Sequence, residues 1–255
     1  MPNLVVIAGP NGAGKSTAAP LLIGKRLGIA EFVNADVIAA GLSAFAPDAV
    51  AIQAGRIMLK RLGELAAAGS DFAFETTLAS RHFARWIAGL RRDRGYRFHL
   101  FFLWLPSAEM AVARVAGRMR HGGHSVPPDV IRRRYRTGIA NFFKLYSPIA
   151  DSRAIYDNTS PPAKLIAERD GTAPIRVGNQ ALWEIIQEES RMKEKEAEYK
   201  AGVEPRVAGI PVSEVTAILT QSGREAFARH KALGIPVVIW RDGKVVELPP
   251  EQIEI

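Results

Sequence analysis

The fold of this chain is decided near its N-terminus by the stretch Leu4-Val5-Val6-Ile7-Ala8-Gly9-Pro10-Asn11-Gly12-Ala13-Gly14-Lys15-Ser16-Thr17. An apolar run of strand length leads directly into a glycine-rich loop that fits the phosphate-binding pattern G-x-x-x-x-G-K-[ST]. This pattern carries meaning only between a buried strand and a helix, and the stretch has that context. We therefore expect residues 9–17 to form a phosphate-binding loop, which we call the P loop.

Each residue type in the P loop has a physical role in binding a nucleoside triphosphate. Glycines allow backbone conformations in which successive N–H groups point at an anion. The helix that begins near Lys15 adds the positive end of its dipole. The Lys15 ammonium reaches the β- and γ-phosphates, and the Ser16 hydroxyl is a ligand for Mg²⁺. The sequence therefore predicts a nucleoside triphosphate site with bound Mg²⁺.

Length and composition limit the classes of protein to consider. The chain of 255 residues can form one large α/β domain with a small appendage. It contains no cysteine, which excludes a disulfide framework and thiolate chemistry. Its longest apolar run, residues 98–105, is too short to cross a bilayer, and the first strand begins too early for a signal peptide. We expect a cytoplasmic protein without a membrane partner.

The positive charge is concentrated in one part of the chain. The net charge is +8, and much of the excess lies between residues 114 and 136. The basic residues there are Arg114, Arg118, Arg120, His121, His124, Arg132, Arg133, Arg134 and Arg136. Such a cluster can bind nucleic acid or gather substrate phosphates. Beside a P loop it favours an arginine-rich lid, and without sustained basic–aromatic interleaving we expect no nucleic-acid partner.

Strand-like and helix-like segments alternate along residues 1–190, which predicts a parallel sheet with crossover helices. The expected strands are residues 4–8, 31–34, 71–75, 97–105, 154–157 and 164–169. The expected helices are residues 15–27, 48–68, 81–94, 107–120, a helix after residue 128 that runs to about 145, and residues 181–200. The fold class is therefore α/β, with a P-loop kinase-like parallel sheet flanked by helices in a domain of residues 1–190.

The C-terminal part has a different pattern. Residues 191–212 are expected to hold the end of a helix and a linker, and residues 213–255 a small helix–hairpin appendage. Ser213 is the expected N-cap of its helix, Gly223 a possible interruption, and Arg241-Asp242-Gly243 the turn of the hairpin. A helix and one hairpin bury too little surface to be stable alone, so this appendage must pack on the main domain or on another protein.

Polar residues follow two of the predicted strands. Asp36 comes shortly after the second strand, and Glu75-Thr76-Thr77 ends the third. The carboxyl ends of parallel strands form the edge where ligands bind, so these groups are expected near the γ-phosphate. An acid there can accept a proton from an attacking hydroxyl or hold Mg²⁺, which favours a small kinase. Alternatively, Asp36 caps a helix and Glu75 is a surface strand end.

Taken together, four segments resemble the zeta toxin family of P-loop kinases, more narrowly the small bacterial branch often labelled predicted ABC-type ATPases. They are GPNGAGKST (9–17), VNADVIA (33–39), FAFETTLASR (72–81) and GGHSVPPDVIRRRYRTGIANF (122–142). The resemblance covers about residues 1–190. It implies that ATP phosphorylates a hydroxyl of a UDP-activated amino sugar, typically UDP-N-acetylglucosamine, and that the protein is a toxin unless an antitoxin restrains it.

The resemblance also implies roles for individual residues. Asp36 matches the general base, and Glu75 and Thr77 match the pair that holds the sugar nucleotide. Arg118 and Arg114 are both candidates for the helix arginine that stabilises the transferred phosphoryl group. The lid candidates are His124, which stands where an arginine is expected, and Arg133, Arg134 and Arg136 on the following helix. Residues 57–61 lack a further acid found in some members, which leaves the sugar specificity open.

Other functions remain open at this stage. A mechanical ABC-type ATPase would need an L-S-G-G-Q-like loop and an apolar strand ending in Asp-Glu, and neither is present. A kinase acting on a nucleic-acid end or another small metabolite is the stronger alternative. Residues 228–251 are similar to short antitoxin-like polypeptides, so residues 213–255 are either an antitoxin in cis or a piece that completes the fold or a dimer. An antitoxin in trans is the other expected partner.

Overall fold

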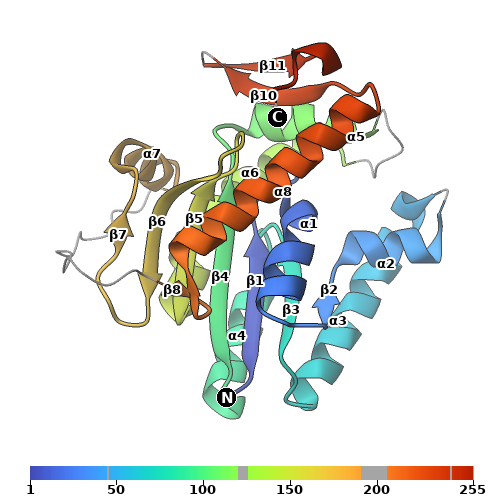
Figure 1. The fold of residues 1–255 in the computed structure, drawn as a ribbon. Helices are drawn as coiled ribbons and strands as arrows, with labels where there is room; N and C mark the ends of the chain where they lie inside the picture. Colours follow the sequence, from blue (N-terminus) through green and yellow to red (C-terminus); the bar gives the residue numbers. More distant parts are fainter. Residues whose placement is uncertain (45, 120–125, 191–205, 242, 255) are drawn as a thin grey trace.

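A central seven-stranded sheet organises the computed structural model, which describes residues 1–44, 46–119, 126–190, 206–241 and 243–254 (Figure 1). The strand order is β2-β3-β1-β4-β5-β6-β7. The five parallel strands are β2 (Phe32–Val33), β3 (Phe72–Thr76), β1 (Asn3–Ala8), β4 (Arg97–Trp104) and β5 (Ser152–Asp157). The antiparallel strands are β6 (Lys164–Asp170) and β7 (Arg176–Val177).

The mixed sheet corrects one expectation and confirms the rest of the fold class. The α/β sheet flanked by helices is present, but β6 runs antiparallel to β5 rather than parallel. Only residues 158–163 join the two strands. A parallel connection needs a crossover of a dozen or more residues, so a link of this length forces the chain to turn back. The parallel part of the sheet therefore ends at β5, and it includes the strands that carry the P loop and the acidic strand ends.

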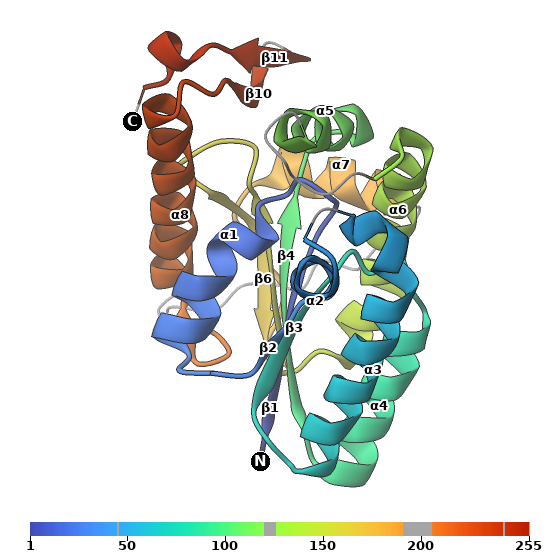
Figure 2. The same cartoon turned by 90° about the vertical axis from the view of Figure 1, so that its right-hand side faces the viewer.

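The helices cover both faces of the sheet (Figure 2), with α1 and α8 on one face and α3 and α4 on the other. Their bounds are α1 (Lys15–Ala19), α2 (Ala35–Leu42), α3 (Ala51–Ala67), α4 (His82–Arg94), α5 (Ala108–Met119), α6 (Pro128–Asn141), α7 (Gln180–Ser190) and α8 (Val212–Ala232). Two π-helical segments continue α1 and α6, at Pro20–Arg26 and Phe142–Tyr146. Short 3₁₀ turns occupy Pro47–Val50, Ser147–Ile149 and Pro250–Gln252. None of the described helices is long and apolar enough to cross a membrane.

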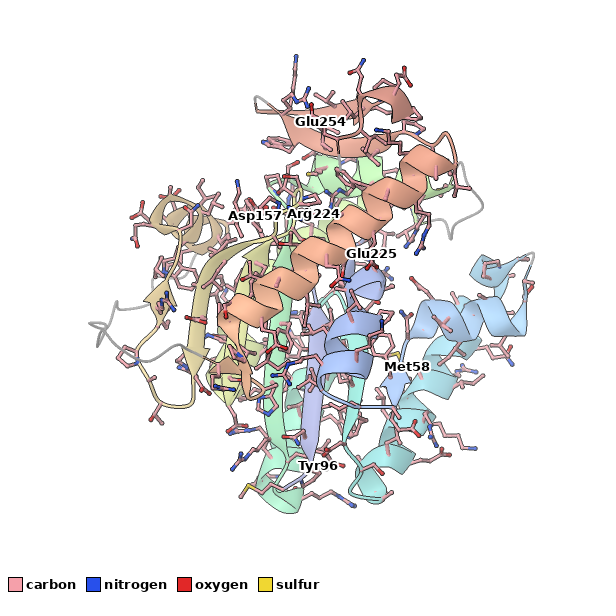
Figure 3. The ribbon with its side chains drawn as sticks, viewed as in Figure 1. Met58, Tyr96, Asp157, Arg224, Glu225 and Glu254 are labelled. Atoms are coloured by element: carbon pink, nitrogen blue, oxygen red, sulfur yellow. The ribbon has the colours of Figure 1, made fainter. Side chains whose placement is uncertain are left out.

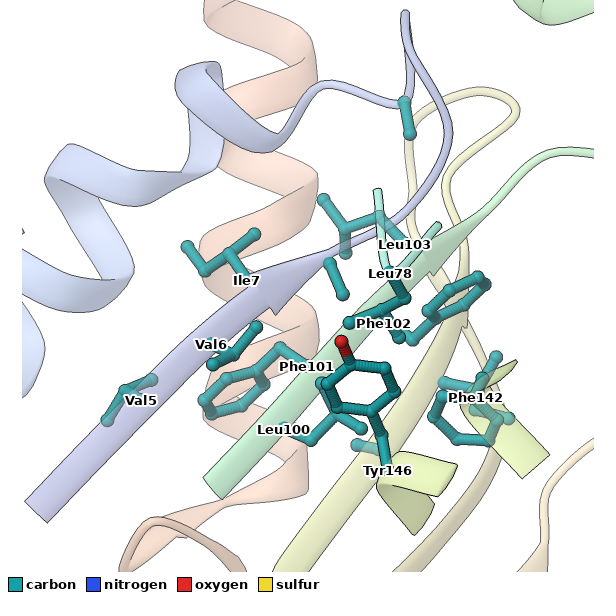
Figure 4. Close-up of a cluster of buried hydrophobic side chains, with 14 of the residues drawn as sticks. Val5, Val6, Ile7, Leu78, Leu100, Phe101, Phe102, Leu103, Phe142 and Tyr146 are labelled. Atoms are coloured by element: carbon teal, nitrogen blue, oxygen red, sulfur yellow. The ribbon is translucent and has the colours of Figure 1, made fainter. Parts of the chain in front are cut away.

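The core is built on β1 and β4, which lie side by side in the middle of the sheet. Residues 4–8 of β1 are completely buried, as expected for a parallel strand with helices on both faces. Figure 4 shows Phe102 of β4 beside Phe142, which comes from the segment after α6. The rings of Phe102 and Phe142 have centroids 5.0 Å apart. This packing fixes the end of β1, and with it the start of the P loop.

The segment between α7 and α8 is more structured than a linker where it is described. Residues 191–205, including the charged run expected at the end of a helix, lie outside the described residues. Strands β8 (Arg206–Val207) and β9 (Ile210–Pro211) then form a small hairpin. Val207 and Ile210 are almost fully buried in the main hydrophobic cluster. The expectation of a linker up to residue 212 is therefore wrong from residue 206 onward.

The long helix α8 also differs from expectation in two details. It begins at Val212 with Pro211 as its N-cap, so Ser213 lies inside the helix and is not the cap. Gly223 does not interrupt it. A Cβ atom at Gly223 would lie 2.8 Å from Pro161 Cγ, so the glycine lets α8 pass close to the loop between β5 and β6. The apolar face of α8, which includes Val215 and Leu219, belongs to the main hydrophobic cluster.

The last two strands, β10 (Val237–Arg241) and β11 (Lys244–Leu248), form a hairpin that lies beyond the end of α8 near α5 (Figure 1). It has a small hydrophobic cluster of its own, formed by Val237, Ile239, Leu248 and Ile253. The outer face of α8 is polar and carries the exposed Arg224 and Glu225 (Figure 3). The C-terminal part thus contacts the main domain through the inner face of α8 and through β10.

Candidate active site

The P loop has the geometry of an anion cradle. Gly9 has a φ of 142°, and a Cβ atom there would lie 2.2 Å from the carbonyl oxygen of Leu103. Gly14 has a φ of 81° and forms the N-cap of α1, and a Cβ atom there would lie 2.9 Å from Asn158 Nδ2. Only glycine satisfies both the left-handed backbone and the close approach. The N-terminus of α1 therefore opens onto a space lined by backbone, as phosphate binding requires.

Lys15 lies between the loop backbone and a carboxylate. Its side chain is 5% exposed, and its Nζ donates a hydrogen bond to the Pro10 carbonyl at 2.8 Å. The same Nζ lies 3.5 Å from Glu75 Oε1. Burial lowers the pKa of Lys15, while the negative charges of Glu75 and Asp36 act in the opposite direction. These two acids therefore favour the cationic lysine that a phosphate needs.

Glu75 is the point at which several site residues meet. It lies at the end of β3, opposite Ile7 of β1, and is mostly buried. Its Oε2 accepts hydrogen bonds from Ser16 Oγ at 2.7 Å and from Asn34 Nδ2 at 2.9 Å. Proteins usually bind Mg²⁺ through one or two carboxylates together with the phosphates of the substrate. The Glu75 carboxylate beside the Ser16 hydroxyl fits this mode of binding. The structure thus places Glu75 next to Lys15 and Ser16.

Asn34 is a site residue that the sequence analysis did not identify. Its Oδ1 accepts hydrogen bonds from the backbone N–H groups of Asp36 at 2.8 Å and Val37 at 3.4 Å, so it is the N-cap of α2. Its Nδ2 donates to Glu75. The alternative in which Asp36 caps the helix is therefore wrong. An asparagine two residues before an acid, directly after a strand, was the available signal, because asparagine is a preferred N-cap. Asn34 fixes the start of α2 relative to the P loop.

Asp36 and Arg118 both line the cavity that contains Lys15 and Glu75. Asp36 lies exposed in the first turn of α2, and Arg118 lies exposed in the last turn of α5. Both act electrostatically on Lys15: the negative charge of Asp36 raises its pKa and the positive charge of Arg118 lowers it. The structure therefore brings an accessible acid and an accessible arginine to the end of the P loop.

Arg114, the other arginine candidate on α5, is engaged with backbone. Its guanidinium donates to the carbonyls of Gly12 at 3.2 Å, Asn158 at 3.1 Å and Val238 at 3.3 Å, and also to that of Thr159. Burial lowers its pKa to about 10, partly offset by Asp157. Four of its five N–H groups are thus used in joining the P loop, the loop after β5, and β10. This geometry suits a positioning role for Arg114.

The remaining predicted site residues lie away from this cavity or outside the described residues. The Thr77 carbonyl lies at the contact between β3 and α6, where a Cβ atom on Gly138 would come within 2.3 Å of it. Arg133, Arg134 and Arg136 lie on α6 and do not line the cavity formed by the described residues. His124 falls within residues 120–125, which are not described. The structure therefore leaves the lid predictions untested.

The cavity has a volume of about 410 Å³ and is lined by three separate parts of the chain. The first is the P loop with Asp36, Glu75 and α5, the second is the loop after β5, and the third is α8 with the start of β10. Among the described residues, no cluster of three His, Cys, Asp or Glu side chains could hold a metal ion by itself. Mg²⁺ fits here only together with phosphate oxygens, which is its usual mode beside a P loop. The cavity can therefore hold a triphosphate with its metal and leave Asp36 accessible.

The family assignment follows from the first half of the chain. A family model described as an AAA domain matches residues 4–145, which include β1, the P loop and the polar ends of β2 and β3. The chain belongs to this AAA domain family. A Haemophilus influenzae protein, described as an uncharacterized protein, is 24% identical over 131 residues, which are 51% of this chain and 91% of that relative.

The solved structures that are similar to this chain are distant in sequence. The AvrRxo1-ORF1:-ORF2 structure with ATP aligns with a TM-score of 0.61 and 16% identity, over 88% of this chain and 76% of that chain. The structure of the PezAT toxin–antitoxin system of Streptococcus pneumoniae aligns with a TM-score of 0.47 and 19% identity, over 62% of this chain and 68% of that chain. The first alignment shows a shared fold. That alignment covers 88% of this chain, whereas residues 1–190 are only about three quarters of it. The aligned part therefore includes residues beyond 190.

Proposed function

We propose that this AAA domain family member is an ATP-dependent kinase that phosphorylates a hydroxyl of a UDP-activated amino sugar such as UDP-N-acetylglucosamine. The observation that carries the kinase proposal is the contact of Lys15 and Ser16 with Glu75, with Asp36 accessible in the same cavity. ATP is supported by the similar fold of the AvrRxo1-ORF1:-ORF2 structure with ATP. The UDP-sugar substrate rests on the resemblance of the motifs around Asp36 and Glu75 to the zeta toxin family.

In the proposed reaction, the P-loop amides and Lys15 bind the triphosphate, and Ser16 and Glu75 would hold Mg²⁺. Mg²⁺, when bound, neutralises charge on the phosphates. Asp36 accepts the proton of the acceptor hydroxyl, while the oxygen of that hydroxyl forms a bond to the γ-phosphorus. The bond from that phosphorus to the β–γ bridging oxygen breaks, and ADP leaves. Arg118 stabilises the charge on the transferred group.

The contacts refine one role implied by the family resemblance. Glu75, matched to the pair that holds the sugar nucleotide, bonds to Ser16 and Asn34. These contacts favour a role for Glu75 on the nucleotide and metal side of the site. Thr77 and the lid residues remain proposed contacts for the second substrate. The sugar nucleotide would approach from the side of α2, where Asp36 is exposed.

The proposed biological role is that of a toxin, because phosphorylated cell-wall precursors cannot be used normally. The proposed partner is an antitoxin in trans rather than residues 213–255. The reason is that the inner face of α8 belongs to the same hydrophobic cluster as the sheet, so this helix cannot leave without exposing core residues such as Val215 and Leu219. An inhibitory segment of the same chain would have to detach from the active site before catalysis, and it would therefore need weaker contacts with the main domain than α8 has.

A transfer assay tests the proposed function. Purified protein is incubated with γ-labelled ATP, Mg²⁺ and a panel of UDP-sugars beside oligonucleotides with 5′-hydroxyl ends. We expect label on a UDP-amino sugar, and we expect Lys15→Ala to abolish it. Lys164→Ala is the matched control, because Lys164 is an exposed lysine on β6 away from the cavity. Label on the oligonucleotide ends alone would contradict the sugar substrate, and equal activity of the Lys15 variant would contradict the kinase.

A further inference from the structure

One wall of the nucleotide cavity comes from a part of the chain that is about two hundred residues from the P loop. Residues on one face of α8 and at the start of β10 line the same cavity as Lys15 and Ser16. They include Gly223, Ala226, Phe227, His230, Pro236 and Val238. We call this surface the C-terminal wall. It has no role in the transfer chemistry proposed above.

The strand order decides which end of a triphosphate the C-terminal wall would meet. Glu75 lies at the end of β3 and Asn34 follows β2, and both strands lie on one side of β1. Asn158 follows β5, which lies on the other side, and its Nδ2 donates to the Ala13 carbonyl of the P loop at 2.9 Å. Pro161, in the same loop, lies against Gly223 of α8. A triphosphate with its γ-phosphate near Glu75 and Asp36 therefore extends across the P loop toward Asn158 and the C-terminal wall.

The chemistry of the lining changes along the same direction. The side chains with a formal charge that line the cavity are Lys15, Asp36, Glu75, Arg114 and Arg118, and all of them lie outside the C-terminal wall. The wall contributes apolar groups, the ring of Phe227 and the imidazole of His230. Charged groups at one end and an apolar, aromatic surface at the other match the two ends of a nucleotide.

Contacts with α5 and within the C-terminal part fix the position of the C-terminal wall. Arg114 Nε donates to the Val238 carbonyl, and Val238 Cγ2 lies 3.7 Å from where a Cβ atom on Gly117 would be. His230 Nδ1 lies 3.1 Å from the Pro236 carbonyl oxygen. Because a carbonyl only accepts, Nδ1 carries the proton in this contact, and Nε2 of the neutral ring is an acceptor. An exocyclic amino group of a base is a suitable donor for it.

From these observations we infer that the C-terminal wall binds the base of the nucleoside triphosphate held by the P loop. The inference rests on the proposed function, because it assumes a nucleotide at Lys15. It assigns residues 222–238 to substrate binding, in place of the inhibitory role considered from the sequence. A base packed against Phe227 and Ala226 would make the C-terminal part necessary for nucleotide affinity. An inhibitory segment would instead compete with the nucleotide.

The test separates the base from the phosphates. Binding of Mg²⁺–ATP and of Mg²⁺–tripolyphosphate, which has no base, is measured by calorimetry for the full-length chain and for Ala226→Leu. We expect the added side chain to weaken ATP binding about tenfold or more and to change tripolyphosphate binding less than about twofold. Ala228→Leu is the matched control, because Ala228 lies on the same helix outside the cavity lining and should leave both affinities unchanged.

A second variant covers the case in which Ala226→Leu does not fold, as judged from its melting temperature. His230→Ala removes only the ring, and we expect it to weaken ATP binding several-fold and to leave tripolyphosphate binding unchanged. Unchanged ATP affinity in the folded variants, an equal loss for both ligands, or tighter ATP binding would each overturn the inference. Tighter ATP binding would indicate that the C-terminal wall blocks the nucleotide site. If the unmodified chain binds neither ligand, the proposed function fails as well, so the two failures are distinguishable.

Discussion

Residues 4–145 and residues 206–254 contribute to the same cavity, but they do so in different ways. The first region contributes its groups through short motifs at the ends of neighbouring strands, such as the P loop and Asn34-Ala35-Asp36. The second region contributes one face of α8 and the start of β10, and its sequence contains no motif that indicates a ligand. Charged groups of a site are therefore visible in the local sequence, whereas a shaped apolar surface depends on how distant elements pack.

The largest expected effect concerns the proposed base in the first region. Asp36→Asn should reduce kcat by about 10²- to 10⁴-fold, because the amide cannot accept the proton of the attacking hydroxyl. The dissociation constant for ATP should change by less than about twofold, because Asp36 belongs to α2 and not to the P loop. Steady-state kinetics and calorimetry measure the two quantities. Asp129→Asn, another exposed acid in the first turn of a helix, is the control. Nearly full kcat in Asp36→Asn would remove it from the base role.

The two arginines of α5 should respond differently to substitution. Arg118 lines the cavity beside the first region, whereas Arg114 bonds to backbone of both regions. We expect Arg118→Ala to lower kcat about 100-fold with little change in melting temperature. We expect Arg114→Ala to lower the melting temperature by about 5 °C or more, because it leaves buried carbonyls of the P loop and β10 without donors. Enzyme kinetics and thermal unfolding of both variants measure these effects. A pure kcat loss for Arg114→Ala would contradict its positioning role.

Within the second region, α8 and the hairpin should differ in stability. Leu219→Ala removes a side chain that is 2% exposed in the main cluster and should lower the free energy of unfolding by about 2–4 kcal/mol. Val246→Ala, a partly buried residue beside the small hairpin cluster, should cost about 1 kcal/mol or less. Denaturant unfolding followed by circular dichroism provides both values. Equal losses would show that the hairpin is as integral to the core as α8.

The smallest expected effect lies at Glu189, near the end of α7. Burial raises the pKa of Glu189, and contacts with Trp104 and Tyr135 partly oppose this. A raised folded-state pKa means that the charged form is disfavoured in the fold, so its cost to stability is absent below the unfolded pKa and grows as the pH rises from the unfolded toward the folded pKa. Glu189→Gln should therefore raise the melting temperature slightly, by about 1–2 °C at pH 7, and not at pH 4. A gain of equal size at both pH values would contradict this explanation.

The parts of the site that the sequence predicted share one property. The P loop, Asp36 and Glu75 could be identified because glycine conformations and strand-end positions depend on a few neighbouring residues. The structure brings Lys15, Ser16, Asp36 and Glu75 together as expected. Asn34 was missed because an N-cap asparagine is common, and its second contact, to Glu75, requires knowledge of which strands are neighbours.

The sequence by itself determined the class of fold and the position of the phosphate-binding end, because strand and helix periodicity and the glycine pattern are local properties. Only the tertiary structure decided the turn of β6, the different roles of Arg114 and Arg118, and the contribution of α8 to the cavity. These features depend on which surfaces meet across the sheet. Arg114 and Arg118 lie one turn apart on α5 and both line the cavity, and only the carbonyls of Gly12, Asn158 and Val238 around Arg114 distinguish it as the structural arginine.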